Sequence, residues 1–259
     1  MKQVVQSARS GTLALKEVPD AKVRSGHLLV RTRASLISAG TERMVVNFAK
    51  KSLAAKAKAR PDLVRKVLDK AKRDGIGATM RAVMARLDEP LPLGYSAVGE
   101  VVEVGAGLEG KFRLGQRVAI AGAGLANHSE MNAVPENLCA PVPDDVNDEE
   151  ACFGTLGAIA MNGVRLVEPQ LGDVVAVIGA GLVGQLAAQF LDLAGCRVVV
   201  LDYNAERLKL ATYAGTELVC DLSQGDPTAA ILDLSGGRGC DGVVIAAASR
   251  ASGPTSAWT

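Results

Sequence analysis

The apolar and polar residues of the 259-residue chain follow two patterns, separated by a basic segment. In the first 35 or so residues, and again from about 96 to 143, short apolar runs alternate with turns rich in Gly, Asn and Pro. Such runs between turn residues are typical of β-strands. They predict a small, mostly antiparallel β-domain with strands near residues 12–18, 27–37, 97–105, 116–122, 131–135 and 138–143.

The intervening segment, at about 41–90, has a helical pattern. Pro61 suits a first helical position, and apolar residues recur at helical spacing over 63–71 and, after a glycine break, over 80–87. The segment holds thirteen Lys or Arg and six Asp or Glu. Its lysines either form a solvated face, as charge runs usually do, or dock an acidic partner domain or cover an anionic substrate.

From Asp148 the pattern changes to one helix followed by apolar strands that alternate with further helices. Apolar strands without polar alternation are typical of a parallel sheet covered on both faces. The chain is therefore expected to be α/β, with residues 1–150 as the β-domain and residues 151–259 as the parallel-sheet domain. The expected parallel strands lie at 174–180, 198–202, 218–221 and 242–249.

Composition narrows the functional classes. Aromatic residues make up only 3% of the chain, which leaves little material for stacking nucleic-acid bases. The start lacks the order of a secretory signal, and no apolar run reaches the roughly 18 residues that span a bilayer, so we expect a cytoplasmic protein without membrane or nucleic-acid partners. The five cysteines are odd in number and none are three apart, which disfavours a disulfide framework or a zinc ribbon.

The most informative motif begins a dinucleotide-binding half near Asp173. Gly179, Gly181 and Gly184 form G-x-G-x-x-G directly after an expected strand and at the start of an expected helix. This arrangement lets backbone N–H groups approach a pyrophosphate. The next strand ends in Asp202, 23 residues after the first glycine, where an acid binds the adenosine ribose.

That acid favours NAD over NADP, because it repels a 2′-phosphate and the residues directly after it bring no cation. Arg207 could reach either a ribose hydroxyl or a 2′-phosphate. A glycine-rich turn without a ligand is the alternative. The expected NAD-binding residues are Gly179, Ala180, Gly181, Leu182, Val183, Gly184, Asp202, Tyr203 and Arg207.

Three further segments resemble motifs of a known protein family: SAGTE at 38–42, LGYSAVGEVVEVG at 93–105 and GQRVAIAG at 115–122. Together with the glycine motif, they make the chain similar to the medium-chain dehydrogenase/reductase superfamily of the zinc alcohol dehydrogenase type over essentially its whole length. The resemblance implies a GroES-like catalytic domain followed by a Rossmann domain, with hydride transfer in the cleft between them.

The zinc chemistry of that family does not carry over. Where the resemblance places the catalytic zinc ligands, this chain has Ala39, Tyr95 and, less securely, Thr155. These side chains lack the thiolate and imidazole of a tetrahedral zinc site. The only histidines are His27 and His128, and a lone histidine on a strand is more often structural than a ligand. We therefore expect a zinc-independent enzyme with no metal ligands.

Without zinc, hydrogen-bond donors must polarise a substrate carbonyl. Thr41 lies where the family carries its proton-relay hydroxyl, and Tyr95 replaces a zinc ligand, so these are the candidate donors. Glu42 and Thr155 are weaker candidates. The alternative is that Tyr95 is a packed aromatic residue and Thr41 a turn residue.

The SAGTER start, the basic insertion and GYSAVGEVVEVG resemble a narrower group, in which such a dehydrogenase module is fused to a second oxidoreductase domain. That resemblance implies a small-molecule substrate derived from a sugar, and a fused or associated second domain. A homo-oligomer is compatible with it.

A doubly wound dinucleotide fold needs six strands, but only ten residues follow GVVIAAAS at 242–249. We therefore expect a truncated Rossmann domain in a chain that is weakly active or inactive alone. Two functions follow from the sequence: an NAD-dependent, zinc-independent alcohol dehydrogenase-like oxidoreductase, and a non-catalytic nucleotide-binding module or N-terminal fragment of a larger two-domain oxidoreductase.

Overall fold

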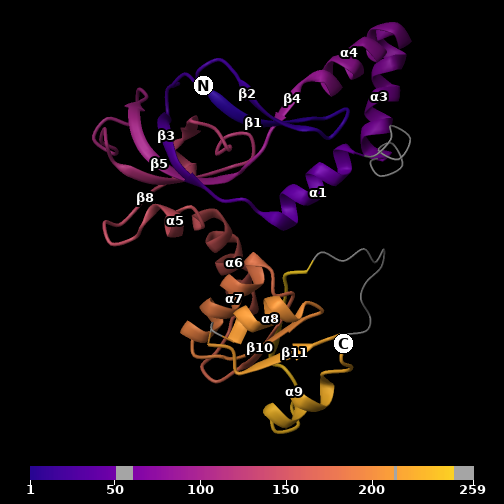
Figure 1. Cartoon of the computed structure of the whole chain (residues 1–259), viewed down its shortest axis with the longest axis vertical. Helices are drawn as coiled ribbons and strands as arrows, with labels where there is room; N and C mark the ends of the chain where they lie inside the picture. The colour runs from indigo at the N-terminus through magenta and orange to yellow at the C-terminus, as the bar shows by residue number, and fades with distance from the viewer. Residues whose placement is uncertain (51–60, 213–214, 248–259) are drawn as a thin grey trace. The chain divides into compact units, whose positions relative to one another are not determined.

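A computed structural model describes residues 1–50, 61–212 and 215–247 of the chain (Figure 1). The chain divides into two compact units, Met1–Thr155 and Leu156–Thr259. The division follows Thr155 because Ala151 and Cys152 pack against Val98 in the first unit.

The first unit is built on a five-stranded antiparallel sheet in the order β7-β3-β5-β6-β8. Apolar residues of the central strands, such as Leu28, Val101 and Ile120, point into one buried cluster, as the alternation in the sequence requires. The sequence thus identified these strands, whose bounds are β3 (His27–Ser35), β5 (Ser96–Val104), β6 (Arg117–Ala121), β7 (Met131–Pro135) and β8 (Cys139–Pro141).

A second, three-stranded antiparallel sheet has the order β2-β1-β4. Its strands are β1 (Lys2–Ser7), β2 (Leu13–Glu17) and β4 (Pro90–Pro92). The three-residue strand β4 begins and ends with proline, which cannot donate to a sheet ladder, so the sequence gives no strand signal there. A short 3-10 turn, η1 (Glu136–Leu138), joins β7 to β8.

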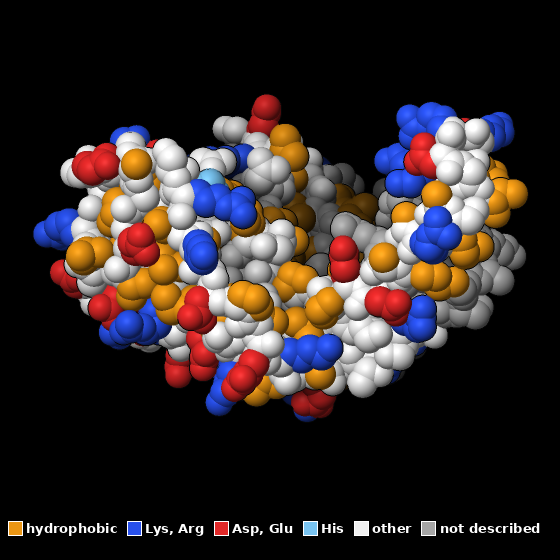
Figure 2. Space-filling model, turned by 90° about the horizontal axis from the view of Figure 1, so that it is seen from above, with side chains coloured by type: hydrophobic (Ala, Val, Ile, Leu, Met, Phe, Trp, Pro, Cys, Tyr) orange, Lys and Arg blue, Asp and Glu red, His pale blue; other side chains and the backbone are white. Residues whose placement is uncertain are grey.

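The basic insertion is helical. It contains α1 (Ala39–Ala49), α3 (Pro61–Asp74) and α4 (Ile76–Asp88), and the break between the last two lies at Gly75, whose φ is 83°. In Figure 2, Lys and Arg side chains gather on the α3–α4 hairpin. The SAGTE segment, in which Thr41 was the alternative turn residue, supplies the first turn of α1.

The single helix expected from Asp148 onward is two helices, α5 (Asp148–Ala151) and α6 (Gly154–Val167). Asn147 and Glu150 cap the first one reciprocally, and Phe153 N–H bonds to the carbonyl of Glu150, which closes a tight turn. The acidic start was therefore a correct helix signal, but the helix that it begins ends after one turn.

The second unit contains a four-stranded parallel sheet in the order β11-β10-β9-β12. Its strands are β9 (Val174–Ile178), β10 (Arg197–Asp202), β11 (Leu218–Asp221) and β12 (Gly242–Ile245), and its helices are α7 (Leu182–Leu193), α8 (Ala205–Thr212) and α9 (Thr228–Leu234). This is the doubly wound order expected for the first four strands of a Rossmann domain.

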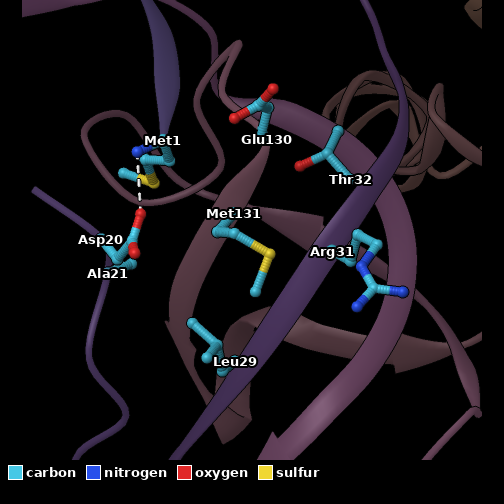
Figure 3. A pocket seen from close by; sticks show the side chains of 8 residues that line it. All are labelled: Met1, Asp20, Ala21, Leu29, Arg31, Thr32, Glu130 and Met131. Atoms are coloured by element: carbon cyan, nitrogen blue, oxygen red, sulfur yellow. Dashed lines mark hydrogen bonds and ion pairs between the residues drawn. The ribbon is translucent and has the colours of Figure 1, made fainter. Parts of the chain in front are cut away.

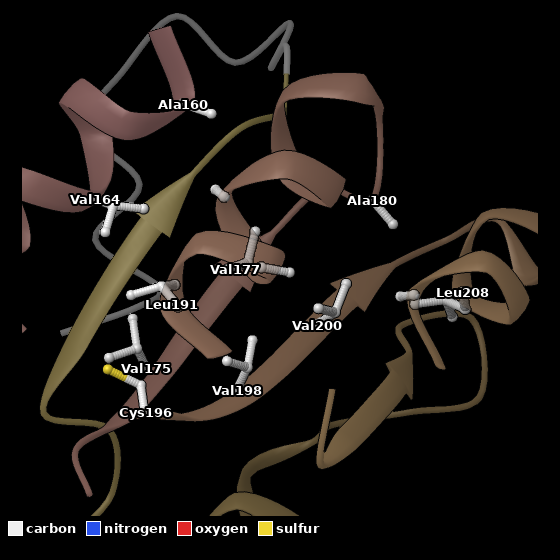
Figure 4. Packing of buried hydrophobic residues seen from close by; sticks show 13 residues of the cluster. Ala160, Val164, Val175, Val177, Ala180, Leu191, Cys196, Val198, Val200 and Leu208 are labelled. Atoms are coloured by element: carbon white, nitrogen blue, oxygen red, sulfur yellow. The ribbon is translucent and has the colours of Figure 1, made fainter. Parts of the chain in front are cut away.

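Valines fill both faces of the central strands. Val175, Val177, Val198 and Val200 pack against Leu191 of α7 on one face (Figure 4). A second cluster, which includes Val199, covers the other face. Because both faces are covered, the apolar runs show no polar alternation.

Among the described residues, no helix is long and apolar enough to cross a membrane.

Candidate functional site

The glycine motif forms the turn between β9 and α7. Gly179 has a φ of 102°, and a side chain there would press on the backbone of Ala246 and Ala247. A Cβ on Gly184 would overlap the carbonyl oxygen of Gly179, so helix and loop approach more closely than any other residue permits. Gly179 and Gly184 are therefore required by the packing of the chain itself, whether or not a ligand binds.

Gly181 differs from the other two glycines of the motif. A Cβ built on it meets no atom within 4 Å, and its φ of −78° suits any residue. It is the N-cap of α7 and supplies no side-chain cap, so the first-turn N–H groups of the helix are available to an external acceptor. Open space beside uncapped N–H groups fits the pyrophosphate of a dinucleotide.

Asp202 ends β10 beside this loop. Its Oδ2 accepts a hydrogen bond from the backbone N–H of Ala180 at 2.7 Å, and its Oδ1 accepts one from the N–H of Asn204 at 2.9 Å. The Asp202 side chain is 12% exposed, and Nη1 of the half-exposed Arg207 lies 3.8 Å from Oδ2. The carboxylate is therefore fixed to the glycine loop and still reaches the surface.

Leu182, Val183 and Tyr203 complete the expected cofactor residues. Leu182 and Val183 lie in the first turn of α7, and Tyr203 is an exposed residue that follows β10. All nine expected residues thus lie on the β9–α7 turn, the first turn of α7, or the segment from the end of β10 into α8.

In the first unit, the structure brings Tyr95 and Thr155 together. The hydroxyl of Thr155 donates to the carbonyl oxygen of Tyr95 at 3.4 Å, and Gly122 N–H donates to the same oxygen at 2.9 Å. Tyr95 is half-buried and immediately precedes β5. Thr155 therefore holds the Tyr95 segment in place rather than presenting a free hydroxyl.

Thr41 and Glu42 lie in the first turn of α1 and differ in exposure. Thr41 is exposed, whereas the Glu42 side chain is 12% exposed and its Oε1 accepts a hydrogen bond from Ser38 N–H at 3.0 Å. Glu42 also pairs with Nε2 of His128, at 3.2 Å from Oε1 and 3.1 Å from Oε2. Sequence reasoning assigned His128 a structural role and did not connect it to Glu42, 86 positions away.

The positions aligned with zinc ligands offer no zinc site. Ala39 has no donor atom, and Thr155 uses its hydroxyl on a backbone carbonyl. Within the described residues, no group of three or more His, Cys, Asp or Glu side chains could hold a metal. The absence of zinc stays a prediction for the protein in solution.

A pocket of about 770 Å³ lies elsewhere in the first unit (Figure 3). The N-terminal ammonium of Met1 forms an ion pair with Asp20 at its edge, at 2.8 Å. The candidate residues Thr41, Glu42, Tyr95 and Thr155 do not line it. The pocket is thus separate from the candidate chemistry.

Residues 183–256 match the family model described as zinc-binding dehydrogenase. The chain is thus similar to zinc-type dehydrogenases of the medium-chain dehydrogenase/reductase superfamily. This similarity agrees with the fold, a GroES-like antiparallel domain followed by a Rossmann sheet.

Two curated relatives are (R,R)-butanediol dehydrogenase of Bacillus subtilis and D-guloside 3-dehydrogenase of Shigella flexneri. The first is 29% identical and covers 57% of this chain and 49% of the relative. The second is 30% identical and covers 59% of this chain and 43% of the relative. The chain thus spans about half the length of these relatives.

Among solved structures, the chain is similar to the Escherichia coli quinone oxidoreductase complexed with NADPH. The TM-score is 0.68, the identity 18%, and the match covers 92% of this chain and 64% of that one. At this identity the likeness shows the fold alone.

Proposed function

We propose that the chain forms the core of a zinc-independent dehydrogenase that transfers hydride between NAD(H) and a secondary alcohol or the corresponding ketone. The observation that carries the proposal is the open, uncapped N-terminus of α7 at Gly181, beside the anchored carboxylate of Asp202. The N–H groups of this turn would hold the pyrophosphate, and Asp202 the adenosine ribose. The nicotinamide, when bound, supplies the hydride acceptor.

NAD is preferred over NADP in this proposal. The Asp202 carboxylate lies where it would repel a 2′-phosphate, and Arg207 Nη1, 3.8 Å from Oδ2, offsets that charge in part. The quinone oxidoreductase of similar fold was solved with NADPH, so cofactor choice has to rest on this acid rather than on the fold.

Two relatives and the side chains available support the substrate class that we propose. Both relatives are named for oxidation of a secondary alcohol, in one case on a sugar. In the absence of a metal, the hydroxyls of Tyr95 and Thr41 are the donors proposed to orient the substrate oxygen. A sugar-derived secondary alcohol is the substrate that we propose.

The direct test is reduction of NAD by the protein as its gene encodes it, with butane-2,3-diol and methyl glycosides as substrates. We expect NADH to form with at least one of them, more slowly with NADP, and without added zinc. A protein that binds neither NAD nor NADP would contradict the proposal.

A further inference from the structure

His128 makes a side-chain hydrogen bond through each ring nitrogen. Its Nδ1 lies 2.9 Å from Oγ of Ser35, and its Nε2 lies 3.1 Å from Oε2 of Glu42. The His128 side chain is 10% exposed. Ser35 ends β3, Glu42 lies in α1, and His128 lies in the loop before β7, so three separate elements converge on one imidazole.

The partners determine where the imidazole proton resides. An ionised Glu42 carboxylate can only accept hydrogen bonds, so Nε2 must donate to it. The lone pair of the neutral ring is then on Nδ1 and faces the hydroxyl of Ser35. A carboxylate, an imidazole and a hydroxyl in this order can accept a proton at the hydroxyl end.

The arrangement is rigidly held. The backbone N–H of His128 donates to the carbonyl of Leu93 at 2.8 Å, and its carbonyl accepts from Val4 N–H at 2.9 Å. A Cβ on Gly94 would lie 2.7 Å from His128 N and 3.0 Å from Nδ1. Gly94, the residue before Tyr95, therefore leaves room for the ring.

The relay residues and the proposed donors lie on the same segments of the first unit. Thr41 precedes Glu42 in α1, and Tyr95 follows the glycine that contacts the His128 ring. The nearby acid on the same loop, Glu130, accepts instead from the backbone N–H of Lys2. Glu42 is thus the carboxylate that the structure pairs with the ring.

We propose that Ser35, His128 and Glu42 form the proton relay of the site, an inference that rests on the dehydrogenase function proposed above. In alcohol oxidation, the substrate C–H bond breaks and its electron pair leaves as hydride to the nicotinamide oxidant. The O–H bond breaks, its electron pair forms the carbonyl, and its proton passes to Oγ of Ser35 as the Ser35 proton moves to Nδ1 of His128. Glu42 stabilises the resulting imidazolium, and reduction reverses each step.

The experiment compares His128→Gln, Ser35→Ala and Glu42→Gln with His27→Gln in the protein as its gene encodes it. His27 is the only other histidine in the chain, so its replacement is a matched control and leaves one imidazole signal for NMR. A lost proton-transfer group typically costs about 10²- to 10⁴-fold in rate. We expect a loss of kcat of about 100-fold or more for His128→Gln, a KM for butane-2,3-diol within about threefold, and no change for His27→Gln.

Two further readouts separate a relay from a packing role. Added imidazole is expected to restore turnover to His128→Ala. In ¹⁵N NMR of the protein without cofactor, His128 is expected to carry its proton on Nε2, and this preference should be lost in Glu42→Gln.

The outcomes distinguish the relay from the dehydrogenase function. Unchanged turnover in His128→Gln, or a proton fixed on Nδ1 in the parent, would overturn the relay and leave the dehydrogenase function standing. A parent protein that binds no nicotinamide dinucleotide would overturn both.

Discussion

Asp202 has two proposed roles in the second unit, one structural and one in cofactor binding. It ties the end of β10 to the glycine loop through Ala180 N–H, and it presents a negative charge at the edge where the adenosine ribose would lie. Asn at this position removes the charge and keeps one oxygen that can accept from Ala180 N–H, although the hydrogen bond from Asn204 N–H is lost.

We predict that Asp202→Asn weakens NAD binding by about 1.5 to 3 kcal/mol, the usual contribution of a hydrogen bond to a charged group. NADP should gain relative to NAD by about tenfold or more, because the repulsion is removed while Arg207 remains. Calorimetric titration with both cofactors measures this. Asp226→Asn is the control, because Asp226 also accepts bonds from a following turn, at Thr228. If the ratio of NAD affinity to NADP affinity is the same in the parent and in Asp202→Asn, Asp202 does not select the cofactor.

At the residue scale, the sequence predicts contacts between residues that are close in the chain. It does not predict contacts between residues that are far apart in the chain. The glycines and Asp202 lie within 24 positions of one another, and their motif fixes the strand, turn and helix around them. The pairing of His128 with Glu42 depends on how α1 packs in the first unit, and no spacing in the sequence encodes it.

At the scale of elements, strands with apolar alternation and helices with apolar periodicity were predictable. The start of α1 was not, because Ala39, Gly40 and Thr41 carry no strong helix signal, and the helix is fixed by Ser38 and Glu42. The long helix expected after Asp148 was wrong because a tight turn at Phe153 interrupts the periodicity without Gly or Pro before it.

One ion pair joins β10 to the residue before β11. Arg197 donates to both carboxylate oxygens of Glu217, at 2.9 and 2.6 Å, and to the carbonyl of Leu234. The hydrogen bond from Arg197 lowers the pKa of Glu217 below its usual value of 4.5. A lowered pKa stabilises the fold above the unfolded pKa, and that contribution is lost as the pH falls through the folded pKa.

We predict that Glu217→Gln lowers Tm at neutral pH by at most about 3 °C, because both side chains are about 40% exposed and surface pairs contribute little. The difference from the parent should shrink as the pH falls through the lowered pKa of Glu217 and vanish once Glu217 is protonated. Thermal denaturation across this pH range measures it. Glu206→Gln, which breaks the more exposed pair with Lys209, should change Tm less. A difference in Tm between parent and Glu217→Gln that persists at low pH would show that the charge of Glu217 does not cause the stabilisation.

At the scale of the whole molecule, similarity to zinc-binding dehydrogenases does not imply that this protein binds zinc. The family model is described as zinc-binding, but the positions aligned with the ligands are Ala39, Tyr95 and Thr155. We predict substoichiometric zinc in protein purified without added metal, measured by elemental analysis, and turnover that survives chelators. One tightly held zinc per chain would contradict this, and would indicate ligands other than the three aligned residues.

The central claim is that the β9–α7 turn binds a dinucleotide, and Gly181 tests it most directly. Because nothing lies within 4 Å of a Cβ there and φ is −78°, Gly181→Ala should fold with an unchanged Tm. The added methyl would occupy the space proposed for the pyrophosphate. Gly184→Ala is the contrasting variant, since its Cβ overlaps the Gly179 carbonyl and should destabilise the fold.

Calorimetric titration of NAD into the parent and Gly181→Ala is the decisive measurement. The account predicts binding to the parent and a loss of about tenfold or more in affinity for the variant, equivalent to about 1.4 kcal/mol, at equal Tm. Equal NAD affinity in the two proteins would contradict it.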